Sequence, residues 1–139
     1  MSVEVAKNLR ARLGDRVAQI SESAQAVIEQ GDLCSATTYL AALEARAEAR
    51  RLLAPLAVVA DLVLAPSALG AAPEGLAFTG DPVMCRPWTL LGLPAANVPA
   101  YRRGDGLPVG VQFVGLAADD LSFLADLALV ETVLTQKED

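Results

Sequence analysis

The side chains that could perform chemistry in this chain are few, and histidine is not among them. None of the 139 residues is histidine, so no imidazole is available as a general base or metal ligand. This excludes a Ser-His-Asp triad, a Cys-His pair and a zinc site with a histidine ligand within the chain. Ser67 and Cys85 could be nucleophiles, but neither has an evident base, and Arg86 alone would activate a thiol weakly. We therefore predict no catalytic residue.

The segment from residue 79 to residue 88 carries the side chains best suited to contact a small substrate. Thr79, Asp81, Arg86 and Trp88 combine a hydroxyl, two opposite charges and the single tryptophan, a combination common in ligand pockets. We take these four as candidate substrate-binding residues. The simpler alternative, which the sequence alone favours, is that Trp88 anchors the core and Asp81 caps a short turn.

Two charged pairs are better explained as structural features. Asp119 and Asp120 stand where a helix should begin, and carboxylates there cap free amides and favour the helix dipole. Arg102 and Arg103 lie at an expected hairpin turn, where we expect them to be solvated. We predict no metal and no cofactor.

The charge balance argues against a nucleic-acid partner. The net charge is −6 and the isoelectric point is near 4.6, and the sequence has no basic stripe to neutralise phosphates. No apolar run approaches the roughly 20 residues of a membrane helix, and the first residues lack the apolar block of a signal peptide. We therefore expect a cytoplasmic protein without a membrane partner, with Cys34 and Cys85 reduced.

The first 60 residues show helical periodicity. Apolar positions predict one helix from about Val3 to Gln30, or two shorter helices divided at Gly14, with Gly31 in the left-handed position that ends a helix. Ser35 is a plausible cap for a second helix that reaches about residue 60, kinked or ended at Pro55. Its expected buried stripe consists of Tyr39 or Leu40, Leu43, Ala47, Leu53 and Leu56.

The rest of the chain is punctuated by proline and glycine and predicts short strands. Seven of the eight prolines lie between Pro66 and Pro108, which favours loops and strands there. The expected elements are a buried strand at 62–65, a loop at 67–87, a strand at 95–101, a turn at 102–106, a strand at 108–115 and a helix at 120–135. The last helix has two apolar faces, so we expect it to be buried on more than one side.

This order of elements predicts an α/β fold, α+β by element order. It has N-terminal helices, a small mixed sheet of about three strands with a hairpin, and a C-terminal helix. We interpret residues 1–139 as a single domain with a helical segment at 1–60 and a second segment at 61–139. A three-stranded sheet leaves two unpaired edges, so we expect self-association into a homo-oligomer.

Several motifs in the second segment resemble the C-terminal portion of the amidase signature family. They are DLVLAPS at 61–67, APEGL at 72–76, TGDP at 79–82, RPWTLLGLPA at 86–95, VPA at 98–100 and GLPVGVQFVG at 106–115. Cys85 stands where the family often has asparagine, and Tyr101 where it often has glycine. The resemblance implies a slice of an α/β/α fold, and it places the loop around residues 79–88 near the substrate pocket.

The resemblance also implies that the catalytic residues are missing. Family members hydrolyse amides with two serines and a lysine from their N-terminal half. Here the only lysines are Lys7 and Lys137, and no two serines are adjacent. We therefore expect a truncated amidase-like protein that is inactive alone. The alternatives are a subunit of a split amidase completed by a separate N-terminal chain, and a non-catalytic small-ligand or protein-interaction module.

Overall fold

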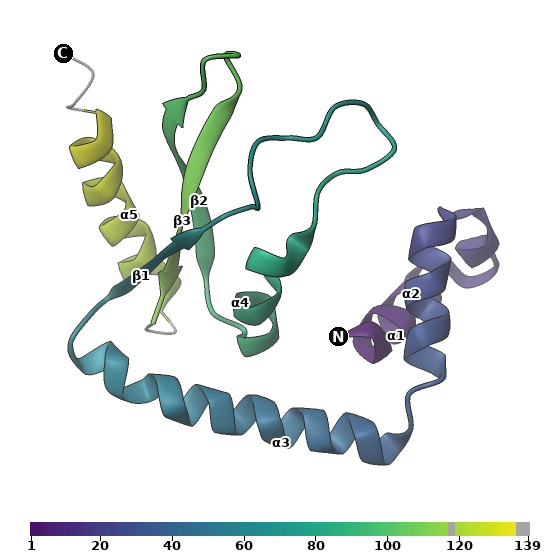
Figure 1. Ribbon diagram of the computed structural model, residues 1–139. Helices are drawn as coiled ribbons and strands as arrows, with labels where there is room; N and C mark the ends of the chain where they lie inside the picture. The colour runs from purple at the N-terminus through teal and green to yellow at the C-terminus, as the bar shows by residue number, and fades with distance from the viewer. Residues whose placement is uncertain (117–118, 136–139) are drawn as a thin grey trace. The chain divides into compact units, whose positions relative to one another are not determined.

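The computed structural model describes residues 1–116 and 119–135, which fall into two compact units (Figure 1). Unit 1 comprises residues 1–48 and unit 2 comprises residues 49–139. The helices are α1 (Ser2–Leu13), α2 (Glu22–Asp32), α3 (Ala36–Leu53), α4 (Arg86–Leu91) and α5 (Asp120–Thr135). The strands are β1 (Leu62–Pro66), β2 (Ala95–Arg102) and β3 (Pro108–Gly115). The order of elements confirms the predicted α/β class.

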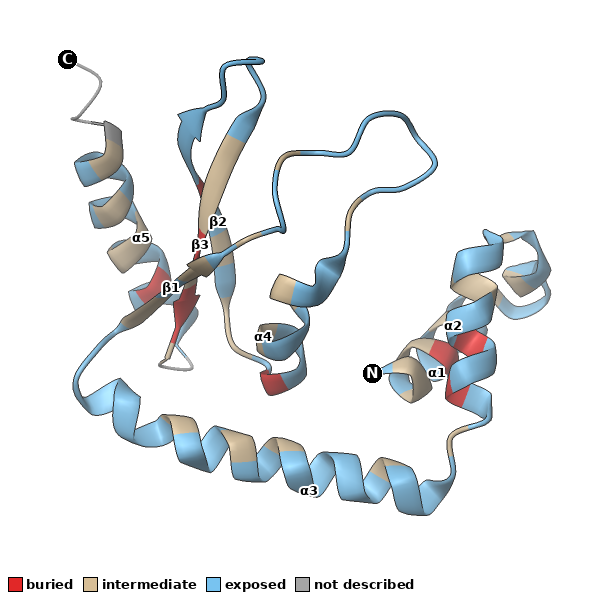
Figure 2. Ribbon diagram, in the orientation of Figure 1, coloured by how far each residue is buried: buried red, intermediate tan, exposed pale blue. Residues whose placement is uncertain are grey.

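Unit 1 is built from two short helices rather than one long helix. Gly14 ends α1 with a positive φ of 53°, a conformation that glycine adopts at little cost. A 3-10 segment follows at Gly14–Gln19, and the Ser21 hydroxyl accepts the Ala24 amide at the start of α2. Ala6 and Ile28 are buried, and Figure 2 shows the buried positions of unit 1 on α1 and α2, which contact one another. The alternative of two helices divided at Gly14 is therefore confirmed.

Gly31 has a different role from the predicted one. It lies inside α2, and its φ is not among the positive values. A Cβ atom at this position would lie 2.7 Å from the carbonyl carbon of Ser2 and 2.9 Å from the Cβ of Ala6. The prediction of a left-handed helix end is therefore wrong, and glycine is required here because α1 approaches α2 too closely for a side chain.

Helix α3 begins as predicted, but it does not bury its apolar stripe. The Ser35 hydroxyl accepts the Thr38 amide at 3.1 Å, which confirms the cap. None of the 18 residues of α3, all within the described part of the chain, is buried. Leu40 remains 59% exposed, so the predicted buried stripe is wrong. A 3-10 segment follows at Ala54–Val58, with Pro55 in its first turn.

The sheet has three strands in the order β1-β3-β2, and β3 is antiparallel to both neighbours. Leu64 pairs with Phe113 across β1 and β3, and Asn97 pairs with Gln112 across β2 and β3. Both strand pairs are therefore antiparallel, and the prediction of a mixed sheet is wrong. Strands β1 and β2 run in the same direction, but β3 separates them. Leu64 is 64% exposed and no residue of β1 is buried, so the prediction of a buried strand is also wrong.

The two faces of the sheet are covered by different elements. On one face, a Cβ atom at Gly115 would lie 2.8 Å from the Phe123 ring, so α5 packs closely there. Figure 2 shows buried residues where β3 meets the start of α5. The side chain of Cys85, just before α4, contacts Gln112 on the other face. Val114 on β3 is fully buried, and it is the centre of the unit 2 core.

Helix α5 is capped as predicted but covered on one side only. Asp119 accepts the amides of Leu121 and Ser122, which confirms its capping role. Leu121 and Leu129 are 78% and 69% exposed, so the prediction of burial on more than one side is wrong. Among the described residues, no helix is both long enough and apolar enough to cross a membrane.

The loop predicted at residues 67–87 ends in helical structure. A 3-10 turn forms at Pro82–Met84, and α4 begins at Arg86. Pro87 lies in the first turn of α4, where its missing amide hydrogen costs nothing. Gly92 ends the helix with a φ of 66°. Proline and glycine therefore mark the two ends of a six-residue helix rather than a continuous loop.

Candidate functional site

Two of the four predicted substrate-binding residues line the same cavity. The loop after β1 borders an open cavity of about 400 Å³, and the exposed residues Thr79 and Asp81 both line it. The lining residues are Ala68, Leu69, Gly70, Ala71, Ala72, Pro73, Phe78, Thr79, Gly80 and Asp81. The walls are mostly apolar, with one hydroxyl and one carboxylate. Such a cavity suits a small ligand that has an apolar body and a hydrogen-bond donor or positive charge.

Asp81 also has the structural role that the simpler alternative gave it. Its Oδ1 atom accepts the Val83 amide at 2.9 Å and so caps the 3-10 turn at Pro82–Met84. The side chain is exposed, so the other carboxylate oxygen can still meet a ligand. The turn therefore fixes the direction of the carboxylate at the edge of the cavity.

Arg86 and Trp88 lie in α4 and do not line this cavity. Arg86 is exposed and Trp88 is half-buried. Trp88 is thus not a fully buried core anchor, although its carbonyl accepts the Leu93 amide at 3.1 Å. The turn between Asp81 and Arg86 separates the four candidates into a loop pair and a helix pair.

Hydrogen bonds of Ser67, Cys85 and Gln112 connect the two ends of this loop to the sheet. The Cys85 thiol donates to the Ser67 carbonyl at 3.6 Å, and the Gln112 amide donates to the Cys85 sulfur at 3.7 Å. The Ser67 hydroxyl donates to the Gly110 carbonyl at 3.2 Å. These contacts tie both ends of the loop to β3. Because both candidate nucleophiles give their protons to carbonyl groups, the cluster holds structure together and does not resemble an activated site.

Gln112 is the residue that the sequence did not single out. It is only 6% exposed, and its Oε1 atom has no hydrogen-bond partner among the residues that the structure describes. A buried polar atom without a hydrogen-bond partner lowers the stability of the fold. The Gln112 Oε1 atom is therefore suited to accept a hydrogen bond from a donor outside the described residues. The signal in the sequence was one amide among Val111, Phe113 and Val114 in a strand. Alternation placed Gln112 on the face of Val114, but it could not say that this face is covered.

No group of three or more His, Cys, Asp or Glu residues in the described ranges is arranged to hold a metal ion. The side chains of the loop cavity and the polar cluster can offer a ligand hydrogen bonds, charge and apolar contact. The described residues contain a loop cavity and a polar cluster, but these do not form an arrangement of nucleophile and base.

Comparisons with known proteins agree with the motifs. The Amidase family model matches residues 4–124, which extends upstream of the motifs. The chain is 31% identical over 134 residues to "Putative amidase AmiA2" of Mycobacterium bovis, covering 88% of this chain and 28% of that protein. It is 49% identical over 45 residues to "Putative amidase AmiB2" of the same organism, covering 32% of this chain and 10% of that protein.

Solved structures show the same fold. A structure titled "Crystal structure of amidase" matches with a TM-score of 0.72 at 23% identity, covering 96% of this chain and 33% of that one. A 6-aminohexanoate cyclic dimer hydrolase matches with a TM-score of 0.63 at 18% identity, over 96% and 33%. The chain thus spans less than a third of the length of the curated relatives it matches. With its motifs, its fold and a family match over residues 4–124, the chain belongs to the amidase family.

Proposed function

We propose that these 139 residues form a C-terminal part of an amidase fold and hydrolyse no amide by themselves. The observation that carries this proposal is the bonding of the two candidate nucleophiles. The protons of Ser67 and Cys85 are both donated to backbone carbonyls, so neither is shared with a side-chain base. The family's serines and lysine have no counterparts in the sequence, as its lysines are Lys7 and Lys137.

The activity test uses the purified chain with a chromogenic anilide. We expect no release of the aromatic amine above the background rate. The variants Ser67→Ala and Cys85→Ala serve as matched controls. Hydrolysis by the unmodified chain that either variant abolishes would overturn the proposal, because it would place a working nucleophile in this segment.

The alternative of a split amidase is favoured by exposed apolar side chains in unit 2. Leu69, Leu76 and Phe78 are 68%, 100% and 59% exposed around the loop. The outer sides of β1 and β2 are also unpaired in the sheet that the described residues form. Large exposed apolar surface and open strand edges are typical of interaction sites. In this alternative, an N-terminal amidase chain covers these surfaces and supplies the catalytic serines and lysine.

A complementation experiment separates this alternative from a chain that acts alone. The mycobacterial relative, cut back to remove the part that matches this chain, is mixed with the 139 residues. Recovered anilide hydrolysis supports the split enzyme, and a catalytic-serine variant of the cut relative is the control. If the two chains do not bind one another, the split enzyme is contradicted. Sedimentation of the chain alone tests the proposed homo-oligomer, which a concentration-independent monomer would contradict.

A further inference from the structure

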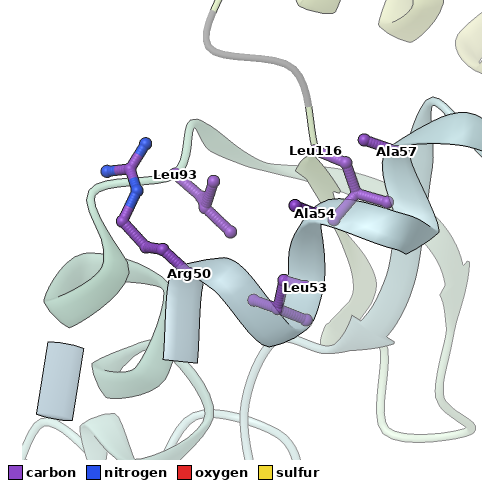
Figure 3. Close-up of a pocket in the computed structure, with 6 residues that line it drawn as sticks. All are labelled: Arg50, Leu53, Ala54, Ala57, Leu93 and Leu116. Atoms are coloured by element: carbon purple, nitrogen blue, oxygen red, sulfur yellow. The ribbon is translucent and has the colours of Figure 1, made fainter. Parts of the chain in front are cut away.

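A second cavity of unit 2 lies away from the loop, where the end of α3 and the following 3-10 segment meet the connections before β2 and after β3, which lie at the same end of the sheet. Its volume is about 260 Å³. It is lined by Arg50, Leu53, Ala54, Ala57, Leu93 and Leu116. We refer to it as the Arg50 cleft. Figure 3 shows Arg50 beside Leu93 at one side of the cleft, with Leu116 close to Ala54 at the other.

The Arg50 guanidinium is held in place from one side. Its Nη1 atom donates to the Leu91 carbonyl at 2.7 Å. Leu91 is the last residue of α4, and carbonyls in the last turn of a helix have no partner within the helix. This bond fixes the planar group at the cleft. A guanidinium carries five N–H donors, and a carbonyl of this kind engages one, so the others can meet a second acceptor.

The other residues that line the cleft determine which class of ligand can supply that acceptor. Arg50 is the only charged residue among the six, and the other five are leucine or alanine. No acidic side chain in the lining competes for the guanidinium. An anion is therefore favoured over a neutral or cationic group, and a carboxylate fits the planar fork of arginine. Phosphates, which usually need several convergent donors, fit this apolar lining less well.

The size of the cleft limits the rest of the ligand. A volume of about 260 Å³ is below the roughly 300–1,000 Å³ of pockets that bind drug-sized molecules. The five aliphatic side chains suit a short hydrocarbon chain or one ring. We propose that the Arg50 cleft binds a small monocarboxylate with an apolar body. The carboxylate meets the guanidinium, and the hydrocarbon lies between Leu53, Leu93 and Leu116.

The test is an NMR titration of the full 139-residue chain with hexanoate. We expect saturable shifts of the backbone amides around Ala57, Leu93 and Leu116. Hexanol and hexylammonium, which have the same number of carbon atoms but no negative charge, should bind at least about tenfold more weakly. Equal binding of hexanol, or shifts confined to residues 68–81, would overturn the proposal.

Variants separate ligand binding from the structural bond to Leu91. Arg50→Met should weaken hexanoate binding about tenfold, and Arg50→Lys should restore only part of it because the planar fork is lost. Ala54→Leu fills the cleft and leaves Arg50 in place, so it should abolish binding even if Arg50→Met disturbs α3. Arg103→Met is the matched control, since Arg103 pairs with Asp105 on the hairpin turn at 3.1 Å. Binding that survives both Arg50→Met and Ala54→Leu, or that falls equally in Arg103→Met, contradicts the proposal.

Discussion

Unit 1 and unit 2 are each stabilised internally by a different kind of contact. In unit 1 two helices that are neighbours in sequence meet at Gly31, where the absence of a side chain lets the Ser2 backbone approach. In unit 2 strand β1 pairs with β3 across more than 40 residues of chain, and Val114 on β3 and Phe123 on α5 are buried. Unit 1 therefore depends on a close backbone approach, and unit 2 depends on apolar side chains and register.

This difference between the units matches the distribution of the amidase motifs along the chain. The family motifs gather in unit 2, in the loop, α4 and the β2–β3 hairpin, where a change of register would move every side chain to the other face. Unit 1 needs only helical periodicity and a few small residues. Substitutions placed in one unit should accordingly leave the other intact, and the following experiments test that independence.

The largest effect is expected from Val114→Asp, which places a charge at the fully buried centre of the sheet. An unpaired buried charge of this kind costs about 3–5 kcal/mol. We expect amide hydrogen exchange to lose protection throughout β1, β2 and β3, while α1 and α2 keep theirs. The control is Leu64→Asp on β1, where the side chain is 64% exposed. Equal loss of protection in unit 1 would contradict the independence of the units.

Gly31→Ala should destabilise unit 1 by about 1–3 kcal/mol, because the new methyl group meets the Ser2 backbone. Urea denaturation followed by the amides of α1 and α2 measures the change. The matched control is Gly70→Ala in the loop of unit 2, where a Cβ atom has nothing within 4 Å. If Gly31→Ala were neutral or stabilising, the close-approach explanation would be wrong.

Ser35→Ala should have a smaller effect, about 1 kcal/mol, because it removes the acceptor for the Thr38 amide at the start of α3. Ser35→Asp keeps an acceptor and should retain most of the stability. Helicity measured by circular dichroism, with exchange rates at residues 36–39, reports the difference. A variant with aspartate that frays as much as the alanine variant would argue against a capping role.

The smallest effects concern pH, and they have opposite signs in the two units. Hydrogen bonds from the Ser122 hydroxyl and amide and from the Leu121 amide lower the pKa of Asp119 below its ordinary value of 3.8. The stabilisation of α5 is therefore present above about pH 4 and is lost as the pH falls through the lowered pKa. Chemical shifts of the Leu121 and Ser122 amides during an acid titration measure it. Asp119→Asn should remove the acid transition.

In unit 1 the pH dependence lies at the basic end. Desolvation, and then the nearby Glu4 carboxylate that accepts the Tyr39 hydroxyl at 3.3 Å, raise the pKa of Tyr39 above its ordinary value of 10.0. The stabilisation is complete below pH 10 and is lost as the pH rises through the raised pKa. Tyr39→Phe should abolish this basic transition. An unchanged absorbance titration of tyrosinate in Glu4→Gln would show that Glu4 has no part in it.

Local features of the fold were predictable from the sequence. The strand at 108–115 and the caps Ser35 and Asp119 lie where they were expected. Alternation, capping hydrogen bonds and turn residues act within a few positions, so a single stretch of chain contains all the information. The end of α1 at Gly14 is also a local feature, because the positive φ of this one glycine is enough to end the helix.

The candidate site was predictable only in part. Thr79 and Asp81 line one cavity, but Arg86 and Trp88 do not join them, because the turn after Asp81 begins a helix that the proline pattern concealed. Gln112 was missed because burial depends on what covers a strand face. The Arg50 bond to Leu91 joins residues 41 positions apart, which no local pattern reveals.

The sequence by itself determined the amidase motifs, the positions of most helices and strands, and the lack of a histidine base. Tertiary structure alone decided which faces are covered: it buried Gln112, left the apolar stripe of α3 exposed and placed α1 against Gly31. The physical reason is the separation along the chain between the residues that interact. Backbone hydrogen bonding and periodicity are set by neighbouring residues, whereas burial and close approach require two distant segments to meet.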